Sequence, residues 1–207
     1  MRTRIDYLAD KYSFTERNES PRLRRQWQDV LEECRLTEAG PEERLRIALL
    51  NVDYVTSFEL PFRLLLTRTP QLIAALREEW DISQKNVVFN DKRFGCVYNL
   101  KASLSGGPDT FRYHLSHRIR RVVANENTSS PYQLIAREVK APRQRLKYAL
   151  ETGLQVSALD GLFWFGSQRI AADILRLRKY GMRIATASVD VYDNITGTTR
   201  HIPVYYS

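Results

Sequence analysis

Several polar side chains with DNA-binding chemistry recur in the helical sequence GSQRIAADILRLRKYG, residues 166–181. In the major groove of DNA, glutamine pairs with adenine and arginine pairs with guanine, each through two hydrogen bonds. The N-terminal residues of a helix in this groove contact the base edges. We therefore expect a DNA-reading surface made of Ser167, Gln168, Arg169, Ala172, Asp173, Arg176 and Lys179.

Asp173 differs from the rest of this surface because DNA phosphates repel a carboxylate. It could accept a hydrogen bond from a cytosine amino group, or it could hold an arginine in place. Arg169 lies four residues before it and Arg176 three residues after, and both spacings allow contact on a helix. We favour the second role.

The same segment also has an inward face. Ile170, Ile174 and Leu177 form an apolar stripe, and Ala171 would allow close packing against the preceding helix. Gly166 would form the turn before the helix with Ser167, and Gly181 would end the helix in a left-handed conformation. A purely structural helix has these features too, so the helix alone does not decide the function.

The charge distribution favours an anionic partner. The chain of 207 residues has a net charge of +8. Residues 1–108 carry 17 Lys and Arg against 16 Asp and Glu, whereas residues 109–207 carry 15 against 8, a net charge of +7. Such an asymmetry is typical of nucleic-acid binding, although many ordinary proteins are also basic.

Regular elements surround the candidate helix. The pattern predicts one helix within residues 130–140, a second that begins at Pro142 and ends before Gly153, and a short apolar helix capped by Ser157. We expect the LFWF sequence of that short helix, residues 162–165, to be buried rather than exposed for docking. Alternating residues from Met182 to the C-terminus, interrupted by DNITG, predict a β-hairpin. Its last residues should pack as a strand, although Tyr205 and Tyr206 could also mediate dimerisation.

The sequence FGSQRIAADILRLRKYGMRI, together with this order of elements over residues 142–207, resembles the winged helix-turn-helix domains common in phage and prophage proteins. The resemblance covers roughly the last 65 residues and implies a DNA-reading helix followed by a wing. The matching residues are Gly166, Arg169, Ile170, Ala171, Ala172, Ile174, Leu177, Arg178, Gly181 and Ile184.

Two further groups are candidate contacts to the DNA backbone. Thr198 and Arg200 near the tip of the expected wing suit phosphate or minor-groove contact, although turns often have this composition for conformational reasons. Arg143 and Arg145 begin a helix, whose N-terminus favours phosphate, but a solvated basic face would look the same. Residues 135–150 have a second helix-turn-helix spacing, weakened because Lys140 replaces the usual turn glycine.

The first half predicts three amphipathic helices: one is capped by Ser20 and begins near Pro21, a second begins near Pro41 and ends near Leu60 and Pro61, and a third begins near Pro70. A hairpin is predicted within residues 86–104. A basic helix should follow from Asp109, with Ile119, Val122 and Val123 inward. The expected fold is α+β and mostly α. It comprises a helical domain with a hairpin over residues 1–124, a linker over 125–131, and a winged helix-turn-helix over 132–207.

Other chemistries have weaker support. His114 and His117 have a metal-ligand spacing but lie in a basic segment, so we expect no metal and no other cofactor. The sequence has no phosphate-binding loop, nucleophile elbow or HExxH motif. Carboxylates in the first half could form a nuclease site, and the candidates are Asp53, Glu59, Glu78, Glu79, Asp81 and Asp91. Cys34 and Cys96 suit free thiols in a reducing compartment. With no signal-like or membrane-spanning stretch, we expect a cytoplasmic protein in a bacterial cell.

The sequence therefore predicts a non-enzymatic, sequence-specific double-stranded DNA-binding protein of phage or mobile-element origin. It would regulate transcription, replication or DNA processing. One alternative is a phage adaptor or inhibitor that binds a host protein through residues 1–124, and a DNA-processing enzyme is another. A host or phage protein, or a second copy of the chain, would be additional partners, and no membrane contact is expected.

Overall fold

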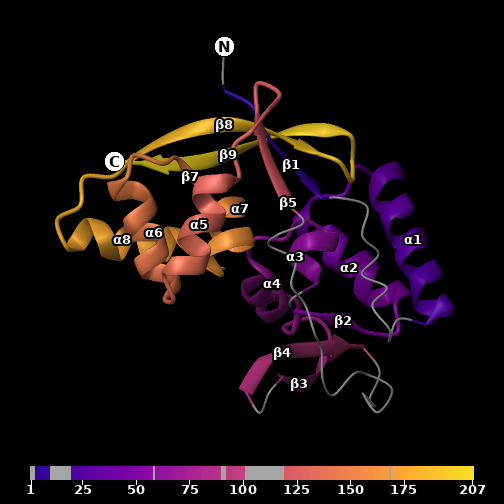
Figure 1. Cartoon of the computed structure of the whole chain (residues 1–207). Helices are drawn as coiled ribbons and strands as arrows, with labels where there is room; N and C mark the ends of the chain where they lie inside the picture. Colours follow the sequence, from indigo (N-terminus) through magenta and orange to yellow (C-terminus); the bar gives the residue numbers. More distant parts are fainter. Residues whose placement is uncertain (1–2, 10–19, 58, 90–91, 101–118, 168) are drawn as a thin grey trace. The chain divides into compact units, whose positions relative to one another are not determined.

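The computed structural model describes residues 3–9, 20–57, 59–89, 92–100, 119–167 and 169–207. These residues form helices and three sheets of three strands each, so the fold is a mixture of α and β structure (Figure 1). The chain divides into two compact units. Unit 1 comprises Met1–Lys11, His114–Asp193 and Thr198–Ser207, and unit 2 comprises Tyr12–Tyr113 and Asn194–Gly197.

This division differs from the expected domain ranges. The expected linker at residues 125–131 lies within unit 1, and the boundaries between the units fall instead after residues 11, 113, 193 and 197. The polar sequence NENTSSP, residues 125–131, is not a linker: it includes a turn residue at Asn125, the strand β6 (Glu126–Asn127) and the start of the helix α5 at Ser130, all within unit 1. A polar, turn-forming sequence marks a surface loop, and it does not by itself separate two cores.

Unit 2 contains the helices and the hairpin expected in the first half. The Ser20 side chain accepts a hydrogen bond from the Leu23 amide at the start of the first helix, as its cap position predicts. The second helix ends at Asn51, about two and a half turns before Leu60, where the sequence indicated its end. The sheet order is β2-β4-β3. The elements are α1 (Pro21–Leu36), α2 (Pro41–Asn51), β2 (Val55–Thr56), α3 (Leu60–Arg63), α4 (Thr69–Leu76), β3 (Ser83–Phe89) and β4 (Lys92–Asn99).

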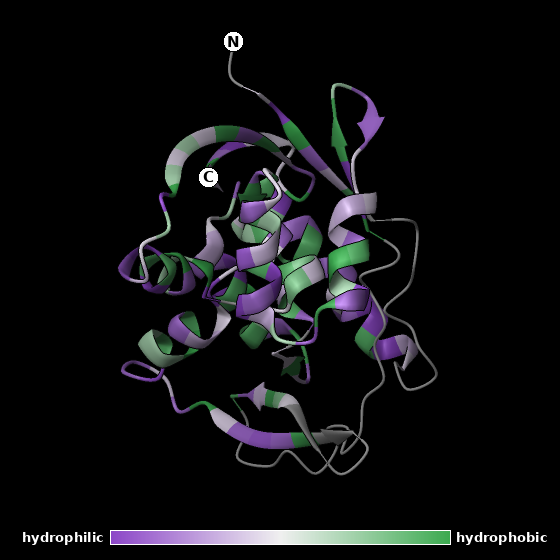
Figure 2. Cartoon of the chain, turned by 60° about the vertical axis from the view of Figure 1, so that its left-hand side comes forward, coloured by the Kyte–Doolittle hydropathy of each residue, from purple (hydrophilic) through white to green (hydrophobic). Residues whose placement is uncertain are grey.

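The apolar faces of these helices pack into one core. Trp27, Val30 and Cys34 of α1 contribute to it, and so does Ile195 from the turn between the last two strands of the chain. Burial of such side chains is the main favourable term in folding. Figure 2 shows hydrophobic and hydrophilic segments side by side along the helices, as expected for amphipathic helices.

The second sheet, in unit 1, joins residues far apart in the sequence. β1 (Ile5–Ala9) pairs antiparallel with β5 (Ile119–Val123), which also pairs with β6 (Glu126–Asn127). The prediction of a helix through Ile119, Val122 and Val123 is therefore wrong. Burial alternates at the start of β5, where Ile119 and Arg121 are buried and Arg120 is exposed, a period that a strand satisfies. The rest of that expected helix, residues 109–118, lies outside the described residues.

The remaining elements of unit 1 follow the order that the sequence predicted. The antiparallel hairpin has a continuous register from Ala185 opposite Tyr206 to Asp193 opposite Thr198, and the sheet order is β7-β9-β8. Gly166 and Gly181 have φ angles of 71° and 92°, as expected for their turn and cap positions. The elements are α5 (Ser130–Glu138), α6 (Pro142–Glu151), β7 (Val156–Ser157), α7 (Ala158–Asp160), the π-helical turn η1 (Gly161–Phe165), α8 (Ile170–Lys179), β8 (Ala185–Asp193) and β9 (Thr198–Tyr206).

The aromatic sequence of η1 lies in the core of unit 1, as predicted. Phe163, Trp164 and Phe165 are all at most 6% exposed. The Tyr132 ring lies 5.4 Å from the Trp164 ring, measured between centroids. Within the described part of the chain, no helix is both long enough and apolar enough to span a membrane.

Candidate nucleic-acid interface

The α8 helix presents a cationic surface on the side opposite its buried stripe. Ile170, Ile174 and Leu177 are buried, as expected, whereas Arg169 and Arg176 are exposed. Lys179 is exposed as well. No described residue forms an ion pair with these three cations. Gln168, which was expected to read bases, lies outside the described residues.

The two alanines of α8 are placed differently from the expectation. Ala171 is exposed and Ala172 is half-buried. The prediction that Ala171 packs against the preceding helix is therefore wrong, and Gly161 makes that close approach instead. A side-chain β carbon at Gly161 would lie 2.8 Å from Cδ1 of Ile170, so only glycine fits without a shift.

Asp173 binds residues outside its own helix. Its Oδ1 lies 3.1 Å from Nε of Arg143 at the start of α6, and its Oδ2 accepts a hydrogen bond of 2.9 Å from the Ser167 hydroxyl. The expected partners, Arg169 and Arg176, are not its ion-pair partners. Helical spacing reveals only contacts within one helix, whereas Arg143 lies 30 residues earlier in the chain.

These contacts change the expected role of Ser167. The N-cap position of α8 is Arg169, and Ser167 does not cap the helix. Ser167 instead is buried and fixes the Asp173 carboxylate, whose side chain is 17% exposed. The single carboxylate of α8 is thereby held against α6, and Arg143 is placed beside the start of α8.

Arg145 has a structural role that the sequence did not reveal. Its guanidinium donates to the carbonyl oxygens of Val139 at 2.5 Å and of Trp164 and Phe165 at 3.4 Å each. These carbonyls end α5 and η1, where helices leave acceptors without partners. Burial lowers the pKa of the guanidinium. Arg145 is therefore committed to carbonyl groups and is poorly placed for a phosphate.

Arg178 fixes the connection between α8 and the hairpin. Its guanidinium donates two hydrogen bonds to the Ile184 carbonyl oxygen, at 3.0 and 2.7 Å, and one to the Thr186 hydroxyl at 2.9 Å. The sequence marked Arg178 only as part of the winged-helix resemblance. On α8, Arg178 therefore binds the start of the hairpin, whereas Arg169, Arg176 and Lys179 face solvent.

The two expected wing contacts lie beside the turn of the hairpin. Arg200 pairs with the fully buried Asp193 at 3.4 Å, and its own side chain is 34% exposed. Thr198 is half-buried and lies opposite Asp193 in the strand register. The turn itself, Asn194–Gly197, belongs to unit 2, where Ile195 is 8% exposed.

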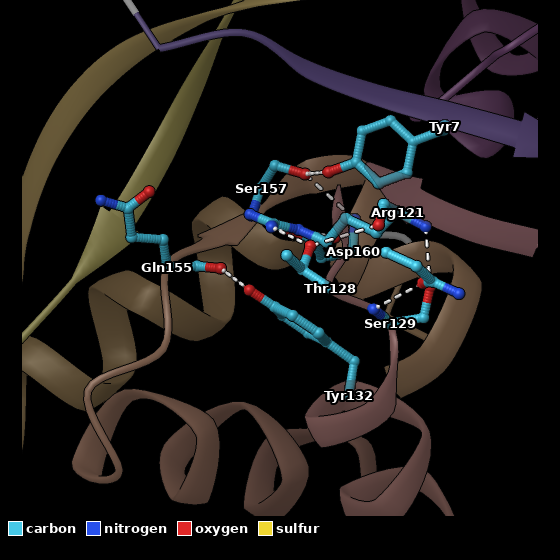
Figure 3. Close-up of polar contacts among 9 residues, drawn as sticks. Tyr7, Arg121, Thr128, Ser129, Tyr132, Gln155, Ser157 and Asp160 are labelled. Carbon is cyan, nitrogen blue, oxygen red and sulfur yellow. Dashed lines mark hydrogen bonds and ion pairs between the residues drawn. The ribbon is translucent and has the colours of Figure 1, made fainter. Parts of the chain in front are cut away.

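Unit 1 contains a buried cluster of polar side chains (Figure 3). Arg121 of β5 donates to Oδ1 of Asp160 at 3.2 Å and to the Thr128 hydroxyl at 2.9 Å. The Ser157 side chain accepts from the Asp160 amide, and the Asp160 carboxylate accepts from the Ser157 amide, which completes a capping box. The Tyr7 hydroxyl lies 2.6 Å from Oγ of Ser157.

This cluster connects β1 and β5 to β7 and α7, which precede η1 and α8 in the chain. Asp160 and Ser157 are fully buried and Arg121 is 4% exposed, so solvent does not reach the ion pair. Burial raises the pKa of the Asp160 carboxyl, and the neighbouring Arg121 opposes this shift. Burial also raises the pKa of the Tyr7 hydroxyl well above its usual value, assisted by the negative charge of Asp160. Such a network is a structural element rather than a site open to substrate.

Carboxylates of unit 2 are engaged by arginines at separate positions. Asp53 accepts from Arg22 at 3.1 Å and Glu59 from Arg63 at 2.6 Å. Glu79 pairs with Arg46, which lowers the pKa of its carboxyl. Across the described ranges, no three or more His, Cys, Asp or Glu side chains form a group that could hold a metal. His114, His117 and Asp91 lie outside those ranges.

Unit 2 also contains a cavity of about 280 Å³. Arg22, Gln26 and Asp53 line it together with apolar side chains such as Leu49 and Leu100. Gln26 exchanges two hydrogen bonds of 3.2 Å with Asp53, so these lining groups bind one another. We assign no chemistry to this cavity.

Comparison of the chain with protein-family models, with curated proteins and with solved structures finds no match.

Proposed function

We propose that this chain is a sequence-specific double-stranded DNA-binding protein whose α8 enters the major groove. The observation that carries the proposal is the distribution of charge on α8. Arg169, Arg176 and Lys179 are exposed, whereas the only carboxylate of the helix, Asp173, is bound by Arg143 and Ser167. A surface of this kind attracts the phosphates of DNA and can present arginine to guanine.

The order of elements supports the proposal of a winged helix-turn-helix. α6, β7, the short helical segment α7–η1 and α8 are followed by the hairpin β8–β9, and all three strands form one sheet. In a helix-turn-helix, the second helix of the pair reads the major groove and its N-terminal residues contact the bases. Here the second helix is α8, and Arg169 lies at its N-terminal end.

Arg143 would contribute a phosphate contact next to the reading helix. It is exposed near the N-terminus of α6, and its bond to Asp173 leaves its side chain 44% exposed. Helix N-termini favour anions, so a phosphate there would gain from both the backbone and the guanidinium. Contacts by Thr198 and Arg200 stay predictions, as do the phage or mobile-element origin and the process that the protein regulates.

The proposal is tested by removing two base-reading cations. The double variant Arg169→Ala/Arg176→Ala should bind a duplex selected from a random pool about 1–3 kcal/mol more weakly for each lost base contact. It should bind unrelated duplexes only modestly more weakly, because phosphate contacts carry most of that affinity. Fluorescence anisotropy titrations on both duplexes measure the two losses.

A matched control removes the same charge elsewhere. Arg24→Ala/Arg25→Ala takes two exposed arginines from α1 of unit 2, so its net charge equals that of the test variant. It should bind the selected duplex like the wild type. Equal losses in the two variants, or no salt-dependent binding of any duplex by the wild type, would refute the proposal.

A further inference from the structure

An apolar patch lies within the cationic surface of α8. We name it the methyl patch and define it as Ala171, Ala172 and Leu175. Leu175 is 54% exposed, Ala171 is exposed one helical turn before it, and Ala172 is half-buried three residues before it. At about 100° per residue, Ala172 and Leu175 project from the half of α8 opposite the buried stripe. They therefore lie where the proposed base-reading surface is centred.

Cations border this patch, and the carboxylate of the helix faces away from it. Arg176 directly follows Leu175, and Lys179 lies one turn beyond Leu175 on the same face. Asp173 is bound to Arg143 of α6. An occupant of this surface must therefore combine negative charge with small apolar groups.

The major groove of DNA offers both negative charge and small apolar groups. Phosphates lie along its edges, and thymine is the base that presents an apolar group, the 5-methyl, in the groove. Alanine and other apolar side chains contact this methyl directly. A hydrogen-bonding side chain at position 175 would instead select among polar base edges.

We propose that the methyl patch reads thymine, so that Leu175 and Ala172 contact thymine 5-methyl groups while Arg169 and Arg176 bind neighbouring guanines. This inference rests on the proposed function, because it requires α8 to lie in the major groove. It adds the prediction that the binding site contains thymines whose methyl groups contribute to affinity.

Replacing thymine with deoxyuridine tests the proposal, because the change removes only the methyl group. The probe is the tightest duplex that the full chain selects from a random pool, with each thymine replaced in turn. At one or more positions the wild type should bind about fourfold more weakly, the value expected for loss of one buried methyl. The Leu175→Ala variant should lose this sensitivity at the position that Leu175 contacts.

Leu134→Ala is the matched control. Leu134 of α5 is 52% exposed, so the same substitution removes an equally exposed leucine from another helix. This variant should keep the full sensitivity to deoxyuridine. Unfolding midpoints of both variants should equal that of the wild type, because neither side chain is buried.

Three results would overturn the inference. The first is equal affinity for every deoxyuridine duplex, and the second is unchanged sensitivity in Leu175→Ala, which would assign the methyl contacts to another surface of the protein. In both, salt-dependent binding to the selected duplex would leave the proposed function standing. The third, absence of any duplex binding by the wild type, would refute both proposals together.

Discussion

Arg121 and Asp160 form the most buried ion pair described in unit 1, and their placement shows what single residues do in this chain. Their side chains are 5% and 0% exposed. A buried charge costs free energy unless it is paired and hydrogen-bonded. Here Thr128, Ser157 and the backbone complete the bonding, so the pair fixes β5 against α7.

The buried hydroxyl of Tyr7 in the same cluster should make the folded protein less stable at alkaline pH. Burial raises the pKa of its hydroxyl in the folded protein, whereas the unfolded chain should ionise near pH 10. Above pH 10 the folded state therefore binds more protons than the unfolded state, and stability falls as the pH rises. The Tyr7→Phe variant lacks this group, so its free energy of unfolding should fall less steeply, by up to about 1.4 kcal/mol per pH unit.

Urea unfolding at intervals from pH 8 to pH 11 measures this difference in slope. At pH 8 the variant should be about 1 kcal/mol less stable, because it loses the hydrogen bond to Ser157. Tyr180→Phe is the matched control, since Tyr180 is 81% exposed, and it should follow the wild-type slope. Identical slopes for Tyr7→Phe and the wild type would contradict the account of the buried hydroxyl.

Among the elements of unit 1, η1 approaches α8 closely at Gly161 and Ile170. A β carbon at Gly161 would lie 2.8 Å from Cδ1 of Ile170, so alanine at this position would force the Ile170 side chain to shift. Gly161→Ala should therefore destabilise the protein by roughly 0.5–2 kcal/mol, the net of an overpacking cost and a smaller gain in helix propensity. The loss is measured by urea unfolding.

A second substitution separates the clash from other effects. Ile170→Val removes Cδ1, so alanine at position 161 should cost about 1 kcal/mol less in that background than in the wild type. Gly40→Ala, where a β carbon would meet nothing within 4 Å, should cost only the loss of a glycine N-cap, roughly 0.5–1 kcal/mol, and that cost should be the same with or without Ile170→Val. Strictly additive losses in the double variant would show that Ile170 is not the obstacle.

Patterns among neighbouring residues predicted the helix caps, turns and final hairpin more accurately than they predicted which elements contact each other. The caps at Ser20 and Ser157, the glycines at 166 and 181, and the final hairpin follow from neighbouring residues, and the structure confirms them. The pairing of β1 with β5 was missed because it joins distant segments and buries an arginine. The prediction of a helix at residues 119–123 was wrong because the apolar residues of so short a segment fit the period of a helix and that of a strand equally well.

The candidate site was predicted in the same uneven way. The exposed cations Arg169, Arg176 and Lys179 lie on α8 as helical periodicity indicated. The partner of Asp173 and the carbonyl contacts of Arg145 depend on how α6, α5 and η1 pack, which spacing within one helix cannot show. Leu175 could have been found as an apolar residue outside the buried stripe of an otherwise charged helix.

At the scale of the whole molecule, unit 1 is built from discontinuous parts of the chain. Its segments Met1–Lys11 and His114–Asp193 meet in the sheet β1-β5-β6, whose strand β5 supplies Arg121 to Asp160. Unit 1 contains the whole candidate interface on α6 and α8. The second half of the chain, with a net charge of +7, contributes most of that unit. The central claim is therefore that α8 of this basic unit reads DNA from the major groove.

Methylation interference on the duplex selected by the full chain tests this claim most directly. Dimethyl sulfate methylates guanine at N7, which faces the major groove, and adenine at N3, which faces the minor groove. We expect guanines methylated at N7 to be depleted from the bound fraction at specific positions, and we expect Arg169→Ala/Arg176→Ala to remove the depletion for at least one of them. Interference confined to adenine N3, or the same guanine pattern in the double variant, would contradict this claim.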